Sequence, residues 1–413
     1  MEPSGADNPT QGRGLHLATL IHLTDLHLLC DSNGVGGTVF DLSKRIGKLV
    51  ALGADTSNSL NKTVREGCGV QDEDAWQALR PTLEGLVAAE HEASMDGAQG
   101  GVAAPVMVVQ TGDVTTFGLD VESAGRPTFP EFHYLQDHLW PQLRSAGAAA
   151  CVDLFGNHDI WPGSYQLTGS RHRFEAVREL SRLATMSGPW PDRWPRPSLQ
   201  LPGGCRLDLV RLNTATIRRW RGAIAAGVVE PYPAARRVDV FRELRDCFAS
   251  ATGEGGRAIR VVLLHHPPHP FETSVLRNPM KSVGTRALYG AKQMSAALQA
   301  AKVHLVIGGH RHDIDPDEGS LPINGGSAVQ RQEPLPARTV QLVASTPTQV
   351  PFPELRGTST PLPSRNSFSV YRIYLEANQQ AVAVTRRVYN RSVSKQFPVD
   401  EVDDEPVARS IPL

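Results

Sequence analysis

This sequence of 413 residues has no closely spaced pair of cysteines, no long apolar segment and no excess of charge of either sign. Its five cysteines are scattered without a CxxC pair, which argues against a disulfide framework and against a zinc–thiolate site. No apolar run approaches the roughly 20 residues that cross a bilayer, and the polar start, MEPSGADNPTQGRG, has no secretory core. We therefore expect a cytoplasmic protein with reduced thiols and no membrane partner.

The charge balance argues against long nucleic acid as a habitual partner. Lys and Arg number 42 and Asp and Glu number 43, so that the formal net charge is −1. Binding to a nucleic acid backbone draws mainly on Lys and Arg that neutralise phosphates. Apolar residues make up 40% of the chain, which is ample for a buried core. The sequence carries no signal for an oligomeric state.

Five short apolar runs, bounded by Gly and Pro, are typical of buried strands. Each run ends directly before polar residues that can carry chemistry. The runs are residues 17–23, 105–110, 149–155, 258–264 and 303–307. Helical patterns occur at residues 73–92 (interrupted by Pro81), 131–144, 171–185, 237–250 and 290–301. Alternating strands and helices indicate a layered α/β fold, in which reactive groups gather beyond the carboxyl ends of the strands.

One catalytic domain, with insertions, accounts for most of the length. We expect it to cover residues 15–345, with an insertion at about 30–100, of which residues 30–72 contain many Gly, Ser, Asn and Asp. Residues 186–204 are rich in Pro and Trp and are expected to form a loop. Trp190 and Trp194 in this loop could stack on a nucleobase, although burial in the core is favoured because Trp is usually buried.

The C-terminal part predicts a small addition to this domain. Residues 346–397 are expected to form a proline-rich linker and then a C-terminal β-hairpin extension that packs on the core. The hairpin covers residues 368–390, with two β-rich runs around the polar turn at 377–380. The acidic tail at 398–413 is expected to be disordered.

The polar clusters after the five runs are each weak evidence by themselves. They are Asp25-Leu26-His27, Gly112-Asp113, Gly156-Asn157-His158-Asp159, His265-His266 and Gly309-His310-Arg311-His312. Gly-Asp is ordinary turn chemistry, Asn or Asp can cap a helix, and a histidine can be a core residue. In the last cluster, two imidazoles at i and i+2 share one side of an extended loop, as metal ligands often do. Arg311 between them can contact phosphate or point into solvent.

Taken in order, the clusters read DxH, GD, GNHD, H and GHxH, and this sequence resembles the calcineurin-like metallophosphoesterases. The resemblance covers roughly residues 17–312. It implies a layered β-sandwich core flanked by helices, within the α/β class. It also implies two divalent metal ions and the hydrolysis of phosphoester bonds in a small substrate.

The resemblance assigns a role to each residue of the clusters. The first metal ion would be bound by Asp25, His27 and His312. The second would be bound by Asn157, His265 and His310, while Asp113 would bridge both ions. Carboxylates, an amide oxygen and imidazoles suit Mn²⁺, Fe²⁺ or Zn²⁺.

The same resemblance identifies the catalytic groups. His158 would protonate the leaving oxygen, and Asp159 would orient the imidazole of His158. Two metal ions about 3.5–4 Å apart lower the pKa of a bridging water for attack on phosphorus and neutralise the phosphoryl oxygens. His265 is preferred to His266 as the ligand because the family's histidine stands two residues before a proline, here Pro267.

Departures from the family's patterns favour one substrate class. Thr116 stands where purple acid phosphatases have a tyrosine ligand. Residues 112–118, GDVTTFG, lack the arginine of the protein phosphatase pattern GDxVDRG. The HHPP segment at 265–268 is similar to that of bacterial cyclic-nucleotide and phosphodiester hydrolases. We therefore expect a phosphodiesterase; the alternatives are a phosphomonoesterase or protein phosphatase, and a non-catalytic scaffold, which the complete ligand set disfavours.

Overall fold

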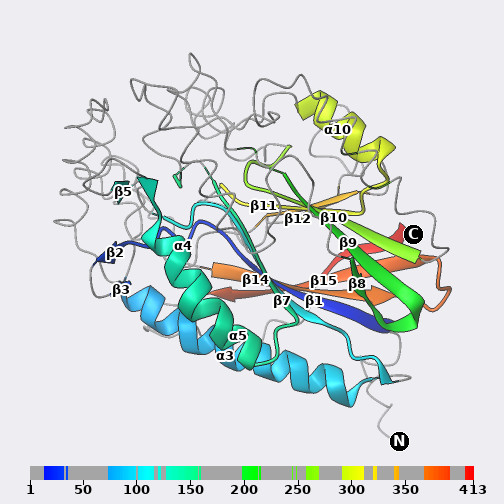
Figure 1. Ribbon diagram of the computed structural model, residues 1–413. Helices are drawn as coiled ribbons and strands as arrows, with labels where there is room; N and C mark the ends of the chain where they lie inside the picture. Colours follow the sequence, from blue (N-terminus) through cyan, green and yellow to red (C-terminus); the bar gives the residue numbers. More distant parts are fainter. Residues whose placement is uncertain are drawn as a thin grey trace, which may run out of the picture.

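The computed structural model of the protein describes residues 14–31, 34–35, 73–98, 101–115, 120–121, 127–156, 158–159, 198–212, 214, 244, 248, 257–268, 291–310, 320–322, 339–343, 367–390 and 405–413. These residues form two six-stranded sheets with helices on their outer faces (Figure 1). Among the helices described, none is both long and apolar enough to cross a membrane.

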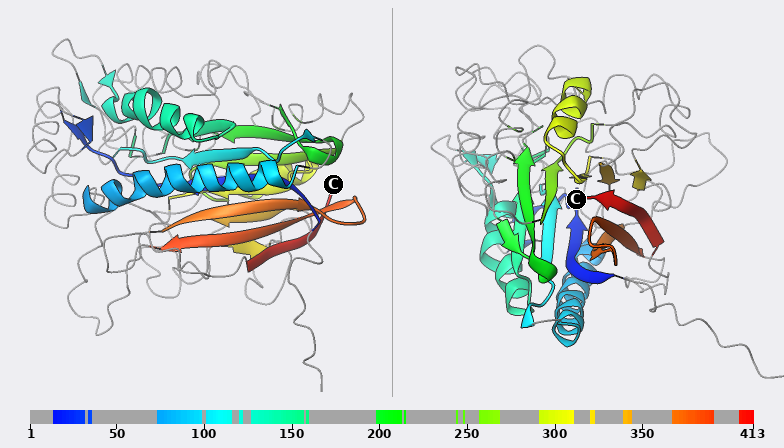
Figure 2. Two further views of the ribbon diagram at one scale, coloured as in Figure 1. Left: turned by 90° about the horizontal axis from the view of Figure 1, so that it is seen from below. Right: turned by 90° about the vertical axis from the view of Figure 1, so that its right-hand side faces the viewer.

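The first sheet has the strand order β16-β15-β14-β1-β4-β7. Its strands are β1 (Leu15–Leu23), β4 (Val106–Thr111), β7 (Ala150–Leu154), β14 (Ser367–Leu375), β15 (Ala381–Asn390) and β16 (Glu405–Pro412). β1, β4 and β7 are parallel, so their carboxyl ends lie at one edge, while β14 runs antiparallel to β1. The C-terminal strands therefore complete one side of this sheet, as the orange and red ribbons of Figure 2 show.

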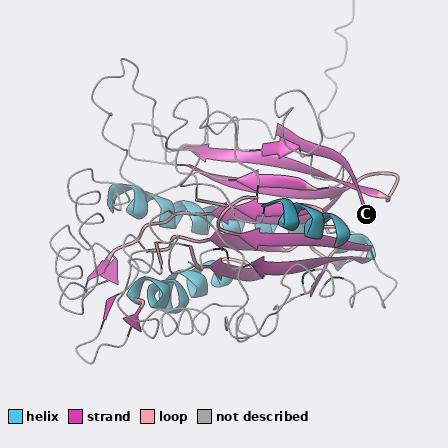
Figure 3. Cartoon of the chain, turned by 90° about the horizontal axis from the view of Figure 1, so that it is seen from above, coloured by secondary structure: helices cyan, strands magenta, loops and turns pink. Residues whose placement is uncertain are grey.

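The second sheet has the strand order β12-β13-β11-β10-β9-β8. Its strands are β8 (Ser198–Gln200), β9 (Cys205–Leu212), β10 (Arg257–Leu264), β11 (Leu305–Gly308), β12 (Ser320–Pro322) and β13 (Val340–Val343). A short 3-10 turn, η3 (Pro202–Gly204), joins β8 to β9. The four central strands are parallel, and the strands of both sheets run side by side when seen from above (Figure 3).

Helices cover the outer face of each sheet (Figures 1 and 2). The first sheet is covered by α3 (Glu73–Asp96), α4 (Pro130–Tyr134), the π-helical turn η2 (Leu135–Leu139) and α5 (Trp140–Ser145). The second is covered by α10 (Ala291–Ala300). Two small ribbons, β2 (Cys30–Asp31) with β3 (Gly34–Val35) and β5 (Asp120–Val121) with β6 (Pro127–Thr128), are also formed.

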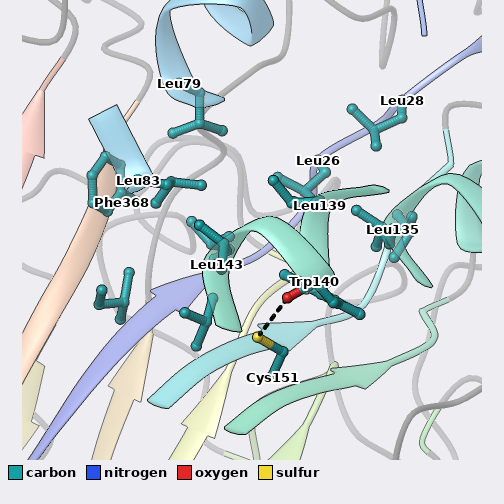
Figure 4. Packing of buried hydrophobic residues seen from close by; sticks show 14 of the residues in the cluster. Leu26, Leu28, Leu79, Leu83, Leu135, Leu139, Trp140, Leu143, Cys151 and Phe368 are labelled. Carbon is teal, nitrogen blue, oxygen red and sulfur yellow. Dashed lines mark hydrogen bonds between the residues drawn. The ribbon is translucent and has the colours of Figure 1, made fainter. Parts of the chain in front are cut away.

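The central strands read as continuous apolar runs because both of their faces are buried. In β4, Val106 and Val108 pack toward the helices, whereas Met107 and Val109 pack toward the second sheet. Figure 4 shows the helix-facing core, where Leu83 of α3 and Trp140 of α5 lie above the strands. This burial on two faces confirms the predicted layered α/β core, and the five predicted strands correspond to β1, β4, β7, β10 and β11.

Two predictions about helices and loops need correction. α3 continues through Pro81 instead of being interrupted there, because Trp76, Leu79 and Leu83 pack against the sheet on both sides of the proline. Packing of this kind outweighs the loss of one backbone hydrogen bond. Within the predicted loop at 186–204, residues 198–200 form β8, whose Leu199 packs against the inter-sheet core.

The C-terminal predictions also change. The hairpin of β14 and β15 is part of the first sheet and no extension packed on it, because residues 369–375 of β14 pair with β1. Residues 405–412, expected to be disordered, form β16, which pairs with β15 and buries Ile411 beside Val382. The predicted helix at 171–185, most of 237–250, Trp190, Trp194 and Arg311 lie outside the described residues.

Candidate metal centre

The segments after β1 and β4 continue side by side beyond the ends of the strands. The N–H of Asp25 donates to the carbonyl of Gly112 at 2.9 Å, and the N–H of His27 donates to the carbonyl of Asp113 at 3.0 Å. Leu28 follows in the same register with Val114. This backbone pairing places the two carboxylates, Asp25 and Asp113, next to each other at the carboxyl edge of the sheet.

Several predicted ligands have a left-handed backbone. φ is 52° at Asp25, 48° at His27, 52° at Asp113 and 70° at His310. Among the described residues, these are four of the six non-glycine residues with a positive φ. Each such residue costs about 1 kcal/mol or more, and such costs are concentrated at functional sites. The strained backbone at these four residues therefore indicates a functional site.

Asp113 and His265 face each other at the centre of the cluster. Nδ1 of His265 donates to the carbonyl of Thr111 at 2.8 Å, which leaves Nε2 directed at Asp113 Oδ2, 3.2 Å away. Burial alone would raise the pKa of Asp113, but the imidazoles of His265, His158 and His27 hold it well below its usual value. Burial alone would lower the pKa of His265, but Asp113 raises it to about 9. Asp113 therefore keeps its negative charge.

Asp25 connects the segment after β1 with the segment after β11. Its Oδ2 accepts the hydroxyl of Thr24 at 2.6 Å and the backbone N–H of His310 at 2.9 Å. His27 lies on the other side, with Nε2 at 4.0 Å from Asp25 Oδ1. All three side chains of Thr24, Asp25 and His27 are fully buried. Asp25 thus fixes the position of His310, although 285 residues separate them.

Glycine precedes three of the predicted ligands because side chains of other segments fill the space beside it. A Cβ at Gly309 would lie 1.7 Å from Thr24 Oγ1. A Cβ at Gly156 would lie 2.2 Å from Asp113 Oδ1, and one at Gly112 would lie 2.4 Å from His265 Nδ1. The Gly of the GD, GN and GH pairs is therefore required by close packing of the centre, and at Gly112 also by a φ of 107°.

Gly309→Ala should consequently damage the centre more than the addition of one methyl group suggests. The added methyl group displaces Thr24 and Asp25, and overpacking of this kind costs about 1–3 kcal/mol. We expect a lower melting temperature and weaker metal binding, measured by thermal unfolding with and without added divalent ions. Gly85→Ala is the matched control, since nothing lies within 4 Å of a Cβ there and alanine favours the helix. A variant as stable and as metal-responsive as the wild type would contradict this account.

Asp159 holds the backbone of the site. Its two oxygens accept the backbone N–H groups of Thr115 at 2.8 Å and Gly156 at 2.7 Å, and the predicted orientation of the His158 imidazole by Asp159 stays a prediction. Burial and Asp113 raise the pKa of Asp159 well above its usual value, against these two hydrogen bonds. Asp159 therefore ties the segment after β4 to the segment after β7.

His158 lies beside the cluster and is half-buried. Its backbone N–H donates to Asp113 Oδ1 at 2.7 Å, and its ring meets that of His27 edge to face, with 4.8 Å between the centroids. The imidazole is therefore fixed next to Asp113 by its backbone and remains open to solvent. This placement suits a group that meets substrate without being a metal ligand.

The structure brings together five of the seven predicted ligands, Asp25, His27, Asp113, His265 and His310. Asn157 and His312 lie outside the described residues. Potential ligand atoms of Asp25, Asp113 and His265 lie within 4.8 Å of one another, and so do those of His265, His266 and His310. Asp113 Oδ2 is buried and, apart from the ion pair with His265 Nε2, accepts no hydrogen bond within the described part of the chain. Oxygen and imidazole donors around such an atom fit divalent metal ions, and the individual ligand assignments stay predictions.

Some residues of the site were not predicted from the sequence. Gln110 holds Gly112 from both sides, donating to its carbonyl at 2.7 Å and accepting its N–H at 3.1 Å. A glutamine at the end of an apolar run is a signal that could have revealed it. Thr24 and Thr214 gave no such signal, because Thr24 fills the space beside Gly309 and Thr214 contacts His266, and both partners are far away in the sequence.

Comparison with known proteins agrees with this geometry. The family model for calcineurin-like phosphoesterases matches residues 18–313, from β1 to just beyond His310. No curated protein matches the chain. The matched range contains every cluster that meets at the carboxyl edges of the two sheets. The chain therefore belongs to the calcineurin-like phosphoesterase family, typically enzymes with two metal ions, and is a metal-dependent phosphoric ester hydrolase.

Proposed function

We propose that this enzyme hydrolyses small phosphodiesters, such as cyclic nucleotides or related compounds. The observation that supports the proposal is the convergence of two carboxylates and two imidazoles, Asp25, Asp113, His265 and His310, beside a half-buried His158. The segment that follows β4, GDVTTFG, contains no arginine that could hold the second charge of a monoester. A phosphodiester carries one negative charge and does not need such a group.

The residues that would hold the two metal ions come from both sheets. Asp25, His27 and His312 would hold the first, and Asn157, His265 and His310 the second, with Asp113 shared. When bound, two ions of Mn, Fe or Zn supply positive charge for the phosphoryl oxygens and activate water. The hydrogen bond from His265 to Thr111 fixes the tautomer that leaves Nε2 available to a metal ion. Asp25 likewise orients His310 through its backbone.

His158 would act on the leaving group. Proton donation by a positioned side chain contributes about 10²–10⁴-fold in rate. The His158 imidazole is placed for this because Asp113 holds its backbone and His27 packs against its ring. Asp159 contributes indirectly, by holding the two segments that carry Asp113 and His158.

We also propose where and with what the enzyme acts. The described cysteines, Cys30, Cys151 and Cys205, are buried thiols that form no disulfide with one another, which supports the expectation of a cytoplasmic protein with reduced thiols. A small phosphoester remains the expected partner, without membrane or long nucleic acid.

The proposal can be tested by removing the metal ions and by comparing hydrolysis of two substrates. Dialysis against a chelator should abolish hydrolysis, and Mn²⁺, Fe²⁺ or Zn²⁺ should restore it, because the phosphoryl charge is otherwise unbalanced. The restored enzyme should hydrolyse bis(nitrophenyl) phosphate faster than nitrophenyl phosphate, measured as kcat/KM for each. Full activity in metal-stripped protein would overturn the two-metal proposal. A strong preference for the monoester would identify a phosphatase, and metal binding without any hydrolysis would identify a scaffold.

A further inference from the structure

His266 follows the predicted ligand His265 and has no part in the roles described above. Its side chain is fully buried. Its ring centroid lies 4.8 Å from that of His265 and 4.3 Å from that of His310. A buried imidazole in contact with two predicted ligands belongs to the centre, so its hydrogen bonds decide what it can do there.

Thr214, just beyond the end of β9, determines which nitrogen of His266 carries the proton. Its Oγ1 accepts the backbone N–H of His266 at 3.0 Å and also lies 2.9 Å from Nδ1 of the same residue. A hydroxyl has one proton to donate, and this buried hydroxyl has Nδ1 as its acceptor within the described residues. When the Thr214 hydroxyl donates to Nδ1, the ring proton of His266 is on Nε2.

Nε2 of His266 is buried and has no hydrogen-bond partner in the part of the chain that the structure describes. A buried donor left without an acceptor costs about 1–3 kcal/mol, so an acceptor is expected when the enzyme works. A protonated Nε2 cannot bind a metal ion, since the lone pair is absent. In a phosphoester hydrolase, an oxygen of the phosphoryl group is an acceptor that the substrate would bring to the centre.

We propose that His266 is a substrate-binding residue whose Nε2–H donates a hydrogen bond to a phosphoryl oxygen held beside His265 and His310. The inference rests on the hydrolysis of phosphoesters at this centre. A hydrogen bond to an anionic oxygen is stronger than one between neutral groups.

Two substitutions separate binding by Nε2 from a purely structural contact with Thr214. The amide nitrogen of glutamine lies near the position of Nε2, whereas the amide of asparagine lies near that of Nδ1. The probe is inorganic phosphate, titrated calorimetrically into metal-loaded protein whose metal content is measured separately. We expect His266→Asn to raise the Kd for phosphate about 10- to 100-fold, as for a lost bond to a charged group. His266→Gln should remain within about threefold of the wild type, and both variants should keep the wild-type metal content.

Other outcomes would overturn the inference. A wild-type Kd in His266→Asn with a weakened His266→Gln would mean that the imidazole serves only to contact Thr214. Loss of metal from both variants would make His266 a metal ligand. If the wild-type protein hydrolyses esters and every variant binds phosphate equally well, only this inference is wrong. If the wild-type protein shows no hydrolysis, the proposed function is wrong.

Thr214→Val provides a second test in which the imidazole stays in place. It removes the hydroxyl that holds the proton on Nε2, so phosphate binding should weaken severalfold, while Thr214→Ser should behave as the wild type. Melting temperatures show whether each variant is folded. If the substitutions at His266 prevent folding, an unchanged phosphate affinity in folded Thr214→Val would overturn the inference.

Discussion

Asp113→Asn should lower kcat/KM by about a thousandfold or more and reduce the metal content of the folded protein. The substitution removes the one charge that would face both metal ions, and a thousandfold corresponds to about 4 kcal/mol. Asp113 is fully buried, 3.2 Å from His265 Nε2, with a pKa held well below its usual value by neighbouring imidazoles. An asparagine keeps the shape and an amide oxygen for the N–H of His158, so the loss reports on charge rather than on packing.

The measurement combines metal analysis with rates on bis(nitrophenyl) phosphate after reconstitution with each divalent ion. Asp137→Asn is a suitable control, because Asp137 is an exposed carboxylate on η2. We expect the control to match the wild type in metal content and rate. Wild-type metal content and activity in Asp113→Asn would show that this carboxylate does not bridge the ions.

The strands that lead to the centre could be predicted because they are buried on both faces. In β1, Leu20 packs toward the second sheet and Ile21 toward the helices, which produces a continuous apolar run. β9 was missed although it is equally buried, because Arg206, Asp208 and Arg211 interrupt its apolar pattern. Arg206 pairs with Asp208, and Arg211 donates to the carbonyl of Asp153, contacts that no linear pattern indicates.

The site could be predicted as a set of residues but not as a set of contacts. The order of the clusters identified the family, and the structure places five of the predicted ligands together. The contacts of Asp159 with the backbone N–H groups of Thr115 and Gly156 were not predicted, since these groups reach its carboxylate only in the folded chain. The role of Thr24 was missed for the same reason, since its hydroxyl, which donates to Asp25, fills the space beside Gly309 only in the folded chain.

His158→Ala should lower the rate of hydrolysis about 10²–10⁴-fold for an alkyl phosphodiester or a cyclic nucleotide and far less for a nitrophenyl diester. An alkoxide leaves with difficulty unless it is protonated, whereas nitrophenolate is stable near neutral pH. The metal content should not change, because the contact between His158 and Asp113 is made by the backbone N–H, which alanine retains. Rates on both substrates, in wild type and variant, provide the test.

The ratio of the two losses distinguishes proton donation from positioning. A donor matters in proportion to the basicity of the leaving oxygen, so the loss must be larger for the alkyl ester. An equal loss on both substrates would mean that His158 only positions the phosphoryl group, for which its contact with the His27 ring provides a rigid support. His133→Ala, a change to an exposed histidine of α4, controls for the removal of an imidazole from the surface. Alanine at 158 also removes the ring that packs on His27, so the metal content must be measured in the same samples. A loss of metal together with an equal loss of both rates would mean that the substitution disturbs the metal centre rather than proton transfer.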